Sequence, residues 1–216
     1  MTLWRLPDPR QFPAGVELIG LTARFDPDLA LVGYRRGIFA MDVAGGVMGW
    51  FSPDPRGVLP LTGLHVGRSL RRARRRFTVT VDRAFAAVVD GCADPARSGA
   101  WITPAYRSVY LELHRRGVAH SVEVWSGPRL AGGVFGVEQG GLFCGESMFH
   151  RDTDASKVAL VELVERLSAG EDSERRLFDV QWWTPHLATL GVVEIPRARY
   201  LDRLPGALAL PPALSG

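Results

Sequence analysis

The sequence contains little cysteine and almost no lysine. Cys92 and Cys144 are the only cysteines among 216 residues, and Cys144 lies in an apolar run. Two cysteines cannot supply a disulfide framework, so we expect both to be packing residues of a reduced, cytoplasmic protein. Lys157 is the only lysine, so arginine supplies nearly all of the positive charge, and the formal net charge is +3.

Long hydrophobic runs are also absent. No apolar stretch approaches the ~20 residues that a membrane helix requires. Residues 1–7 do not combine a basic segment with a following apolar one, so we expect no export signal. Hydrophobic residues make up 46% of the chain and charged residues 23%, which is typical of a globular protein with one sizeable core, with or without a small appendage.

Several common enzyme motifs are missing. The five histidines and two cysteines do not show zinc-type spacing, so we expect no metal and no other cofactor. There is no G-x-S-x-G elbow, P-loop or dinucleotide fingerprint. The glycine turn at residues 139–141 joins two expected strands, whereas a phosphate or coenzyme A cradle needs a glycine loop that opens a helix.

The order of the expected elements indicates an α/β (α+β) fold with a mixed sheet. The strongest turn cluster, residues 52–57, predicts a boundary between a small N-terminal domain (1–57) and a second domain (58–216). We expect irregular structure over 1–20 and a loop over 98–102, and a proline-rich tail finishes the chain after 195. Helices are expected over 26–37, 65–77, 83–92, 103–116 and from 154 and 184, and strands over 77–81, 121–125, 130–137, 142–149 and 177–182.

Two of these expected strands carry polar side chains within apolar runs. Strand alternation places Glu146 on the side of the other even-numbered residues of 142–149. In 177–182 it places Asp179 and Gln181 side by side, opposite the even-numbered residues. An ionised carboxylate on an apolar face needs a charged or hydrogen-bonding partner. The three side chains therefore suggest a polar cluster, and a buried ion pair or a strand end that reaches water is the alternative.

The segment 65–77 combines an apolar stripe with a row of arginines. The stripe predicts a helix, and its other faces carry no acidic residue, so a polyanion such as RNA is the expected partner. A solvated surface is the alternative. The apolar residues are Val66, Leu70, Ala73 and Phe77, and the arginines are Arg68, Arg71, Arg72, Arg74, Arg75 and Arg76.

Several of these runs resemble one family, the leucyl/phenylalanyl-tRNA–protein transferases. The resemblance covers roughly residues 25 to 200, in the family's order. It is carried by W-F-S-P-D-P-R-G-V-L at 50–59, W-I-T at 101–103, A-H-S-V-E-V-W at 119–125, F-C-G-E-S-M-F at 143–149, A-S-K at 155–157, D-V-Q at 179–181 and H-L-A-T-L-G at 186–191.

The resemblance implies a small N-terminal domain followed by an acetyltransferase-like (GNAT-type) domain. It implies an enzyme that moves Leu or Phe, and Met less well, from charged tRNA to the N-terminal amine of proteins starting with Arg or Lys. Such tagging marks proteins for the bacterial N-degron pathway. The alternatives are an acyl-coenzyme-A-dependent N-acetyltransferase of the same fold and a non-enzymatic RNA-binding protein.

The resemblance also implies roles for particular residues. Asp179 and Gln181 would be catalytic, and Glu146 would bind the basic side chain of the acceptor. The arginine helix would bind the tRNA acceptor stem. Trp101 and Phe143 would pack against the terminal adenosine. The other implied substrate-binding residues are Val134, Met148, Leu160 and Phe178 in a pocket for the Leu or Phe side chain, together with Gly145 and Trp50.

Overall fold

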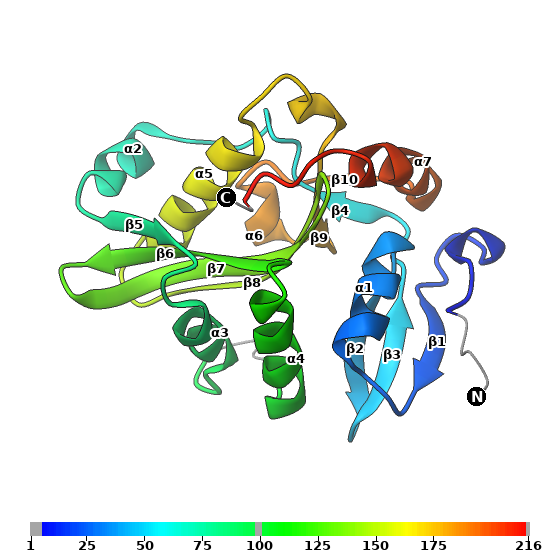
Figure 1. Ribbon diagram of the computed structural model, residues 1–216. Helices are drawn as coiled ribbons and strands as arrows, with labels where there is room; N and C mark the ends of the chain where they lie inside the picture. The colour runs from blue at the N-terminus through cyan, green and yellow to red at the C-terminus, as the bar shows by residue number, and fades with distance from the viewer. Residues whose placement is uncertain (1–5, 98–100, 215–216) are drawn as a thin grey trace.

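The computed structural model describes residues 6–97 and 101–214, so residues 98–100 of the expected 98–102 loop lie outside the described part. The chain forms a small sheet and a large sheet (Figure 1). The small sheet has the order β1-β3-β2, from β1 (Leu18–Thr22), β2 (Phe39–Ala44) and β3 (Val47–Phe51), and α1 (Pro27–Arg35) packs beside it. The predicted mixed α/β class with an additional N-terminal unit is confirmed.

The large sheet has seven strands in the order β10-β4-β9-β8-β7-β6-β5. Among the strands of residues 6–97 and 101–214, only β8 and β9 pair in parallel. The helix α5 (Ala155–Leu167) makes the crossover that a parallel pair requires. The predicted hairpin is present as β7 and β8. The strand bounds are β4 (Arg56–Val58), β5 (Thr78–Val81), β6 (Ala119–Ser126), β7 (Arg129–Gln139), β8 (Leu142–His150), β9 (Leu177–Gln181) and β10 (Val193–Ile195).

Helices cover both faces of the large sheet (Figure 1). The helices α3 (Phe85–Ala93) and α4 (Pro104–Arg115) lie on one side, and α2 (Arg68–Arg74) and α5 lie on the other. Because strand side chains alternate, β7 sends Phe135 into the core under α3 and α4, and Val134 into the core under α5. The remaining helical segments are η1 (Pro9–Gln11), η2 (Ser173–Arg175), α6 (Pro185–Ala188) and α7 (Arg197–Leu208).

Local sequence signals explain the helix that begins at residue 27. Asp26 caps α1 by accepting a hydrogen bond from the Leu29 amide at 2.9 Å, and Pro27 occupies the first helical position. Gly37 follows the helix with a φ of +71°, a conformation that glycine adopts without strain. The predicted start and end of this helix are confirmed.

The proline-rich tail after residue 195 contains a helix that was not predicted, α7 (Arg197–Leu208). Tyr200, Leu201, Leu204 and Ala207 recur at helical spacing and are all buried, so the segment gains a packed helical face. The domain division predicted after residue 57 stays a prediction; the large-sheet strand β4 spans that position.

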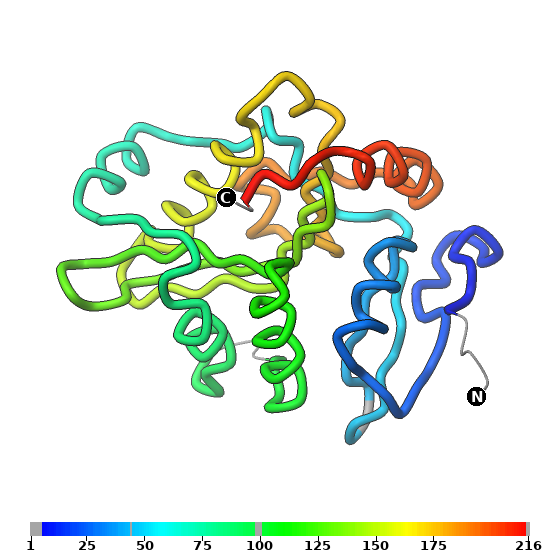
Figure 2. The backbone as a smooth tube through the Cα atoms, viewed as in Figure 1, coloured from blue at the N-terminus to red at the C-terminus, as the bar shows by residue number. Residues whose placement is uncertain are grey.

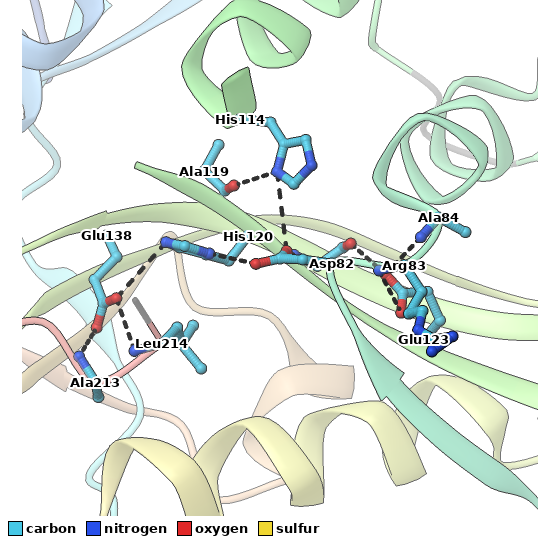
Figure 3. A network of polar contacts seen from close by, with 11 residues as sticks. Asp82, Arg83, Ala84, His114, Ala119, His120, Glu123, Glu138, Ala213 and Leu214 are labelled. Atoms are coloured by element: carbon cyan, nitrogen blue, oxygen red, sulfur yellow. Dashed lines mark hydrogen bonds and ion pairs between the residues drawn. The ribbon is translucent and has the colours of Figure 1, made fainter. Parts of the chain in front are cut away.

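The C-terminal tail runs from α7 back towards the large sheet (Figure 2). Glu138 on β7 accepts hydrogen bonds from the backbone amides of Ala213 at 2.7 Å and Leu214 at 3.1 Å. Figure 3 shows His120 between this carboxylate and Asp82, whose Oδ2 lies 2.7 Å from the His120 Nδ1. Burial raises the pKa of Glu138. This network fixes the tail to the sheet.

Two further expectations can be compared with the fold. Both cysteines are free and buried, which confirms their prediction as packing residues. Among residues 6–97 and 101–214, no helix combines the length and the apolar character needed to cross a membrane.

Candidate active site

The candidate site lies where β8 and β9 part. Their parallel pairing is limited to Leu142–Cys144 on β8 and Leu177–Asp179 on β9. Just beyond the last pair, a hollow of about 160 Å³ opens between the two strands and reaches α5 and α6. Its walls are mainly apolar and include Leu59, Val134, Gly145, Glu146, Ser147, Met148, Leu160, Phe178, Val180, Gln181, Leu187 and Val192.

A β-bulge changes the expected alternation along β8. Phe135 pairs with Ser147 and Gly136 pairs with Gly145, so Glu146 is an extra residue on this strand. The expectation that Glu146 and Met148 share one side is therefore wrong. Met148 packs in the core cluster under α5, whereas Cys144 packs in the cluster under α3 and α4.

Glu146 is held by two tyrosines. Its Oε1 accepts a hydrogen bond from the Tyr34 hydroxyl at 2.8 Å, and its Oε2 accepts one from the Tyr110 hydroxyl at 2.6 Å. Tyr34 comes from α1 and Tyr110 from α4, so the carboxylate lies where the small sheet's helix meets the large unit. Burial raises the pKa of Glu146 to about 7, although both tyrosine hydrogen bonds act in the opposite direction.

Asp179 is fully buried and does not line the hollow. Arg56 binds it through two hydrogen bonds, from Nε to Oδ1 at 2.8 Å and from Nη2 to Oδ2 at 2.5 Å. The Tyr200 hydroxyl also donates to Oδ2 at 2.9 Å. Burial alone would lower the pKa of Arg56, but the adjacent Asp179 carboxylate outweighs that effect and raises it, so the pair is ionic.

Gln181 lies at the end of β9 with a φ of +63°, in the left-handed region that non-glycine residues rarely adopt. Its backbone amide donates to Asp179 Oδ1 at 2.9 Å. The turn in the backbone breaks the alternation, so Gln181 lines the hollow together with Phe178 and Val180. The expected side-by-side placement of the Asp179 and Gln181 side chains is therefore wrong. Gln181 Nε2 is buried and has no hydrogen-bond partner among the described residues.

The four residues implied for an apolar pocket do come together. Val134, Met148, Leu160 and Phe178 all line the hollow, although they come from β7, β8, α5 and β9. Gly145 also lines it, and a Cβ atom on this residue would lie only 2.9 Å from the Phe178 ring. The ring therefore packs directly against the strand backbone at this position.

The three aromatic candidates lie in different places. Phe143 is buried under the hollow's wall and packs edge-to-face against Phe178, with ring centroids 5.2 Å apart. Trp50 is fully buried among the small sheet and α1. The structure thus places neither where it could contact a substrate directly. Trp101 keeps exposed surface and packs edge-to-face against Tyr106, with ring centroids 5.1 Å apart.

The arginine helix is shorter than predicted and less uniformly cationic. It spans Arg68–Arg74, and a groove of about 600 Å³ separates it from α5. Arg74 forms ion pairs across this groove with Glu162 at 2.9 Å and Glu165 at 2.5 Å. The sequence segment contains no acidic residue, but the fold supplies two from α5.

The predicted site residues do not include the four side chains that hold Glu146 and Asp179, those of Tyr34, Tyr110, Arg56 and Tyr200. Tyr34 and Tyr110 were not recognised because a tyrosine in an amphipathic helix looks like any other core residue. Arg56 and Tyr200 contact Asp179. A signal for Arg56 was present, since a carboxylate in a buried strand requires a cation, and Arg56 directly precedes an apolar strand.

Comparison with known proteins gives consistent matches along the chain. The family described as leucyl/phenylalanyl-tRNA protein transferase matches residues 58–205, and its N-terminal domain matches residues 23–54. The leucyl/phenylalanyl-tRNA–protein transferase of Salinibacter ruber is 50% identical over 189 residues, which cover 86% of this chain and 81% of that relative. The corresponding protein of Ruegeria pomeroyi is 51% identical over 191 residues, covering 84% and 86% of the two chains.

Solved structures show weaker likenesses. A GCN5-related N-acetyltransferase from Kribbella flavida aligns with a TM-score of 0.34 and 13% identity, over 78% of this chain and 60% of that one.

These matches place the protein among the aminoacyltransferases, enzymes that transfer an amino acid from aminoacyl-tRNA. The chain belongs to the leucyl/phenylalanyl-tRNA–protein transferase family. This result favours the transferase over the two alternatives drawn from the sequence, an acyl-coenzyme-A-dependent enzyme and a non-enzymatic RNA-binding protein.

Proposed function

We propose that the protein transfers Leu or Phe, and Met less well, from charged tRNA to the N-terminal amine of proteins that begin with Arg or Lys. The hollow between β8 and β9 is the main support, because it joins apolar walls to Glu146 and Gln181. Apolar walls suit a Leu or Phe side chain, and a carboxylate beside them suits a basic acceptor.

The donor side chain would occupy the apolar part of the hollow, against Val134, Met148, Leu160 and Phe178. The whole hollow has a volume of about 160 Å³. An apolar cavity of about 150 Å³ accommodates benzene, so a single Leu or Phe side chain fits this space. Hydrophobic pockets discriminate similar apolar side chains by only about 1–3 kcal/mol, which agrees with a small group of donors rather than one.

The acceptor would be selected by Glu146. Its carboxylate would pair with the guanidinium of Arg or the ammonium of Lys, a charge-assisted contact that a neutral side chain cannot make. Tyr34 and Tyr110 hold the carboxylate in place from opposite oxygens. An arriving cation also favours the ionised form of a carboxyl group whose pKa is about 7.

In the reaction, the neutral α-amine attacks the ester carbonyl of the aminoacyl-tRNA. A C–N bond forms, the ester C–O bond breaks, and the amine loses the proton that the leaving ribose oxygen gains. The Gln181 amide oxygen would accept a hydrogen bond from the amine. A free α-amine has a pKa near ~8, so its neutral form is accessible and positioning is the main demand on the enzyme.

The tRNA would bind along α2. Arg68, Arg71, Arg72, Arg75 and Arg76 would contact phosphates, and Arg74 would contribute less because two glutamates already hold it. Trp101 would stack on the terminal adenosine, a contact worth about 1–3 kcal/mol per base. In the cell, the transfer would mark its acceptors for the N-degron pathway in the cytoplasm.

One assay tests this function. The protein is incubated with leucyl-tRNA carrying labelled leucine and with a peptide that begins with Arg. Label should appear on this peptide, and should be absent from a peptide that begins with Ala and from one whose N-terminal Arg is acetylated. Equal labelling of the Ala peptide would contradict the assignment of Glu146, and acetyl transfer from acetyl coenzyme A would favour the N-acetyltransferase.

A further inference from the structure

Arg56 lies at a buried junction of segments that are far apart in the sequence. Its Nε and Nη2 bind both oxygens of Asp179 on β9, and its Nη1 donates to the backbone carbonyl of Gly37, which follows α1, at 3.1 Å. Only 1% of the Arg56 side chain and none of the Asp179 side chain is exposed. The guanidinium therefore joins the small sheet's segment to β9.

Two aromatic rings enclose the guanidinium. Its Cζ lies 5.0 Å from the ring centroid of Phe39 on β2 and 4.7 Å from that of Tyr200 on α7. A Cβ atom on Gly37 would lie 2.6 Å from a Leu201 methyl carbon, so this side of the junction has no spare space. The plane and position of the Arg56 side chain are thus fixed by packing as well as by hydrogen bonds.

The hydrogen bonds around Asp179 occupy both of its oxygens. Oδ1 accepts from Arg56 Nε and from the Gln181 amide. Oδ2 accepts from Arg56 Nη2, from the Tyr200 hydroxyl and, at 3.7 Å, from the Cys144 thiol. The carboxylate is fully buried and paired with a cation, so it offers neither a free oxygen nor a net charge to a substrate. Through the Gln181 amide it is hydrogen-bonded to a residue that lines the hollow.

That backbone is in an unfavourable conformation. A φ of +63° at Gln181 persists only where the surroundings impose it. The hydrogen bond from the Gln181 amide to Asp179 Oδ1, at 2.9 Å, is one such restraint, and it is made by a carboxylate that Arg56 holds in a fixed orientation. Gln181, at this turned backbone, is one of the residues that line the hollow.

We propose that Arg56 is a positioning residue for aminoacyl transfer. It orients the Asp179 carboxylate, which holds Gln181 in its left-handed conformation and so keeps the Gln181 amide at the hollow. This inference rests on the proposed role of Gln181 toward the acceptor amine. The planar guanidinium is required, because a lysine ammonium cannot bind both carboxylate oxygens and the Gly37 carbonyl in one plane.

A double-mutant cycle tests the inference in single-turnover assays with leucyl-tRNA and an Arg-initiated peptide. In the otherwise wild-type protein, Arg56→Gln should lower the rate of transfer by about tenfold or more, with half-saturating concentrations of both substrates changed by less than about twofold. In the Gln181→Ala background, the same substitution should change the residual rate by less than about twofold, because its effect passes through Gln181.

Two further substitutions, each made with and without Gln181→Ala, sharpen the test. Arg107→Gln is the matched control, since Arg107 forms a surface ion pair with Asp90. It should leave the rate of the wild type and the residual rate of Gln181→Ala unchanged. Tyr200→Phe removes one hydrogen bond to Asp179 and keeps the ring, so it serves if Arg56→Gln does not fold. It should lower the rate in the Gln181 background and leave it unchanged in the Gln181→Ala background.

The outcomes distinguish a failure of the positioning role of Arg56 from a failure of the proposed function. Suppose that Arg56→Gln, or Tyr200→Phe in its place, lowers the rate of transfer by the same factor in the wild-type and Gln181→Ala backgrounds. This result would overturn the positioning role and leave the proposed function intact. A Gln181→Ala protein as active as the wild type would instead overturn the role of Gln181 in the proposed function.

Discussion

Glu146 and Gln181 line one hollow, although they come from different strands and each departs from regular strand geometry. Glu146 is the extra residue of a bulge, and Gln181 has a positive φ. Both irregularities lie just beyond the last parallel pair, Cys144 with Asp179. The hollow therefore opens where β8 and β9 separate, beside these two irregular residues.

Transfer to an Arg-initiated peptide should depend on the ionisation of Glu146. Burial raises its pKa to about 7, so the carboxylate is mostly protonated at pH 6 and mostly ionised at pH 8. The apparent affinity for the Arg peptide should rise over this interval in the wild type. In Glu146→Gln the affinity should be lower by about 1.5–3 kcal/mol at pH 8 and should lack this rise. Peptide titrations at fixed leucyl-tRNA check this, and an identical rise in the variant would contradict it.

The same shift predicts a change in stability. Because the pKa of Glu146 is higher in the folded protein than its usual value of 4.5, its contribution to stability is fully present below about pH 4.5 and is lost as the pH rises through about 7. Glu146→Gln stays neutral. Relative to the wild type, the free energy of unfolding of this variant should increase by about 2 kcal/mol between pH 5 and pH 8. Urea unfolding at both values measures this, and a pH-independent difference would count against the raised pKa.

Narrowing the hollow should change the choice of donor. Leu160→Phe places a ring in a space of about 160 Å³, so a Phe donor should lose more than a Leu donor. We expect the ratio of transfer from leucyl-tRNA to transfer from phenylalanyl-tRNA to rise about tenfold, which corresponds to about 1.4 kcal/mol. Leu163→Phe is the comparison variant, since Leu163 is buried in the same helix but does not line the hollow. A ratio unchanged by Leu160→Phe would place the donor side chain elsewhere.

The arginines of α2 and its C-terminal end should not be equivalent in binding tRNA. Arg71→Glu with Arg75→Glu should raise the Michaelis constant for tRNA about tenfold or more and flatten its salt dependence. Arg74→Ala should have a smaller effect on tRNA, because this side chain already pairs with Glu162 and Glu165. Assays at two salt concentrations measure both effects. An unchanged constant in the double variant would remove this segment from the tRNA site.

Removing one partner of the buried Arg56–Asp179 ion pair should destabilise the protein more than removing both partners. Arg56→Met leaves Asp179 buried without its cation and should destabilise the protein by about 3–5 kcal/mol. Adding Asp179→Leu removes the unpaired charge and should recover part of this loss. Urea unfolding of both variants measures the difference. A double variant less stable than Arg56→Met would contradict this view of the pair.

The sequence was sufficient for regular elements but not for their irregular ends. Periodic apolar residues and caps predicted α1, the β7–β8 hairpin and β9. The bulge at Glu146 and the positive φ of Gln181 could not be predicted, because neither has a glycine at its position and both depend on how neighbouring strands separate. The sequence pattern therefore predicted these strands correctly. Strict alternation, however, placed the side chains of Met148 and Gln181 on the wrong sides of their strands.

Contacts between distant segments could not be predicted from the sequence either. Tyr34 and Tyr110 reach Glu146 from two helices, across 112 and 36 positions of the chain, and Glu162 reaches Arg74 from another helix. A pairing of this kind is determined by tertiary packing, so the local composition of the sequence does not indicate it. The family resemblance supplied the four residues of the apolar wall, which periodicity alone would assign to the core.

The central claim is that Glu146 selects the acceptor whose amine reacts at the hollow. Its most direct test is the ratio of kcat/KM for an Arg-initiated peptide to that for an Ala-initiated peptide, measured with leucyl-tRNA in the wild type and in Glu146→Gln. We predict that the ratio falls by about 10- to 100-fold in the variant. An unchanged ratio in a folded, active Glu146→Gln protein would contradict the account.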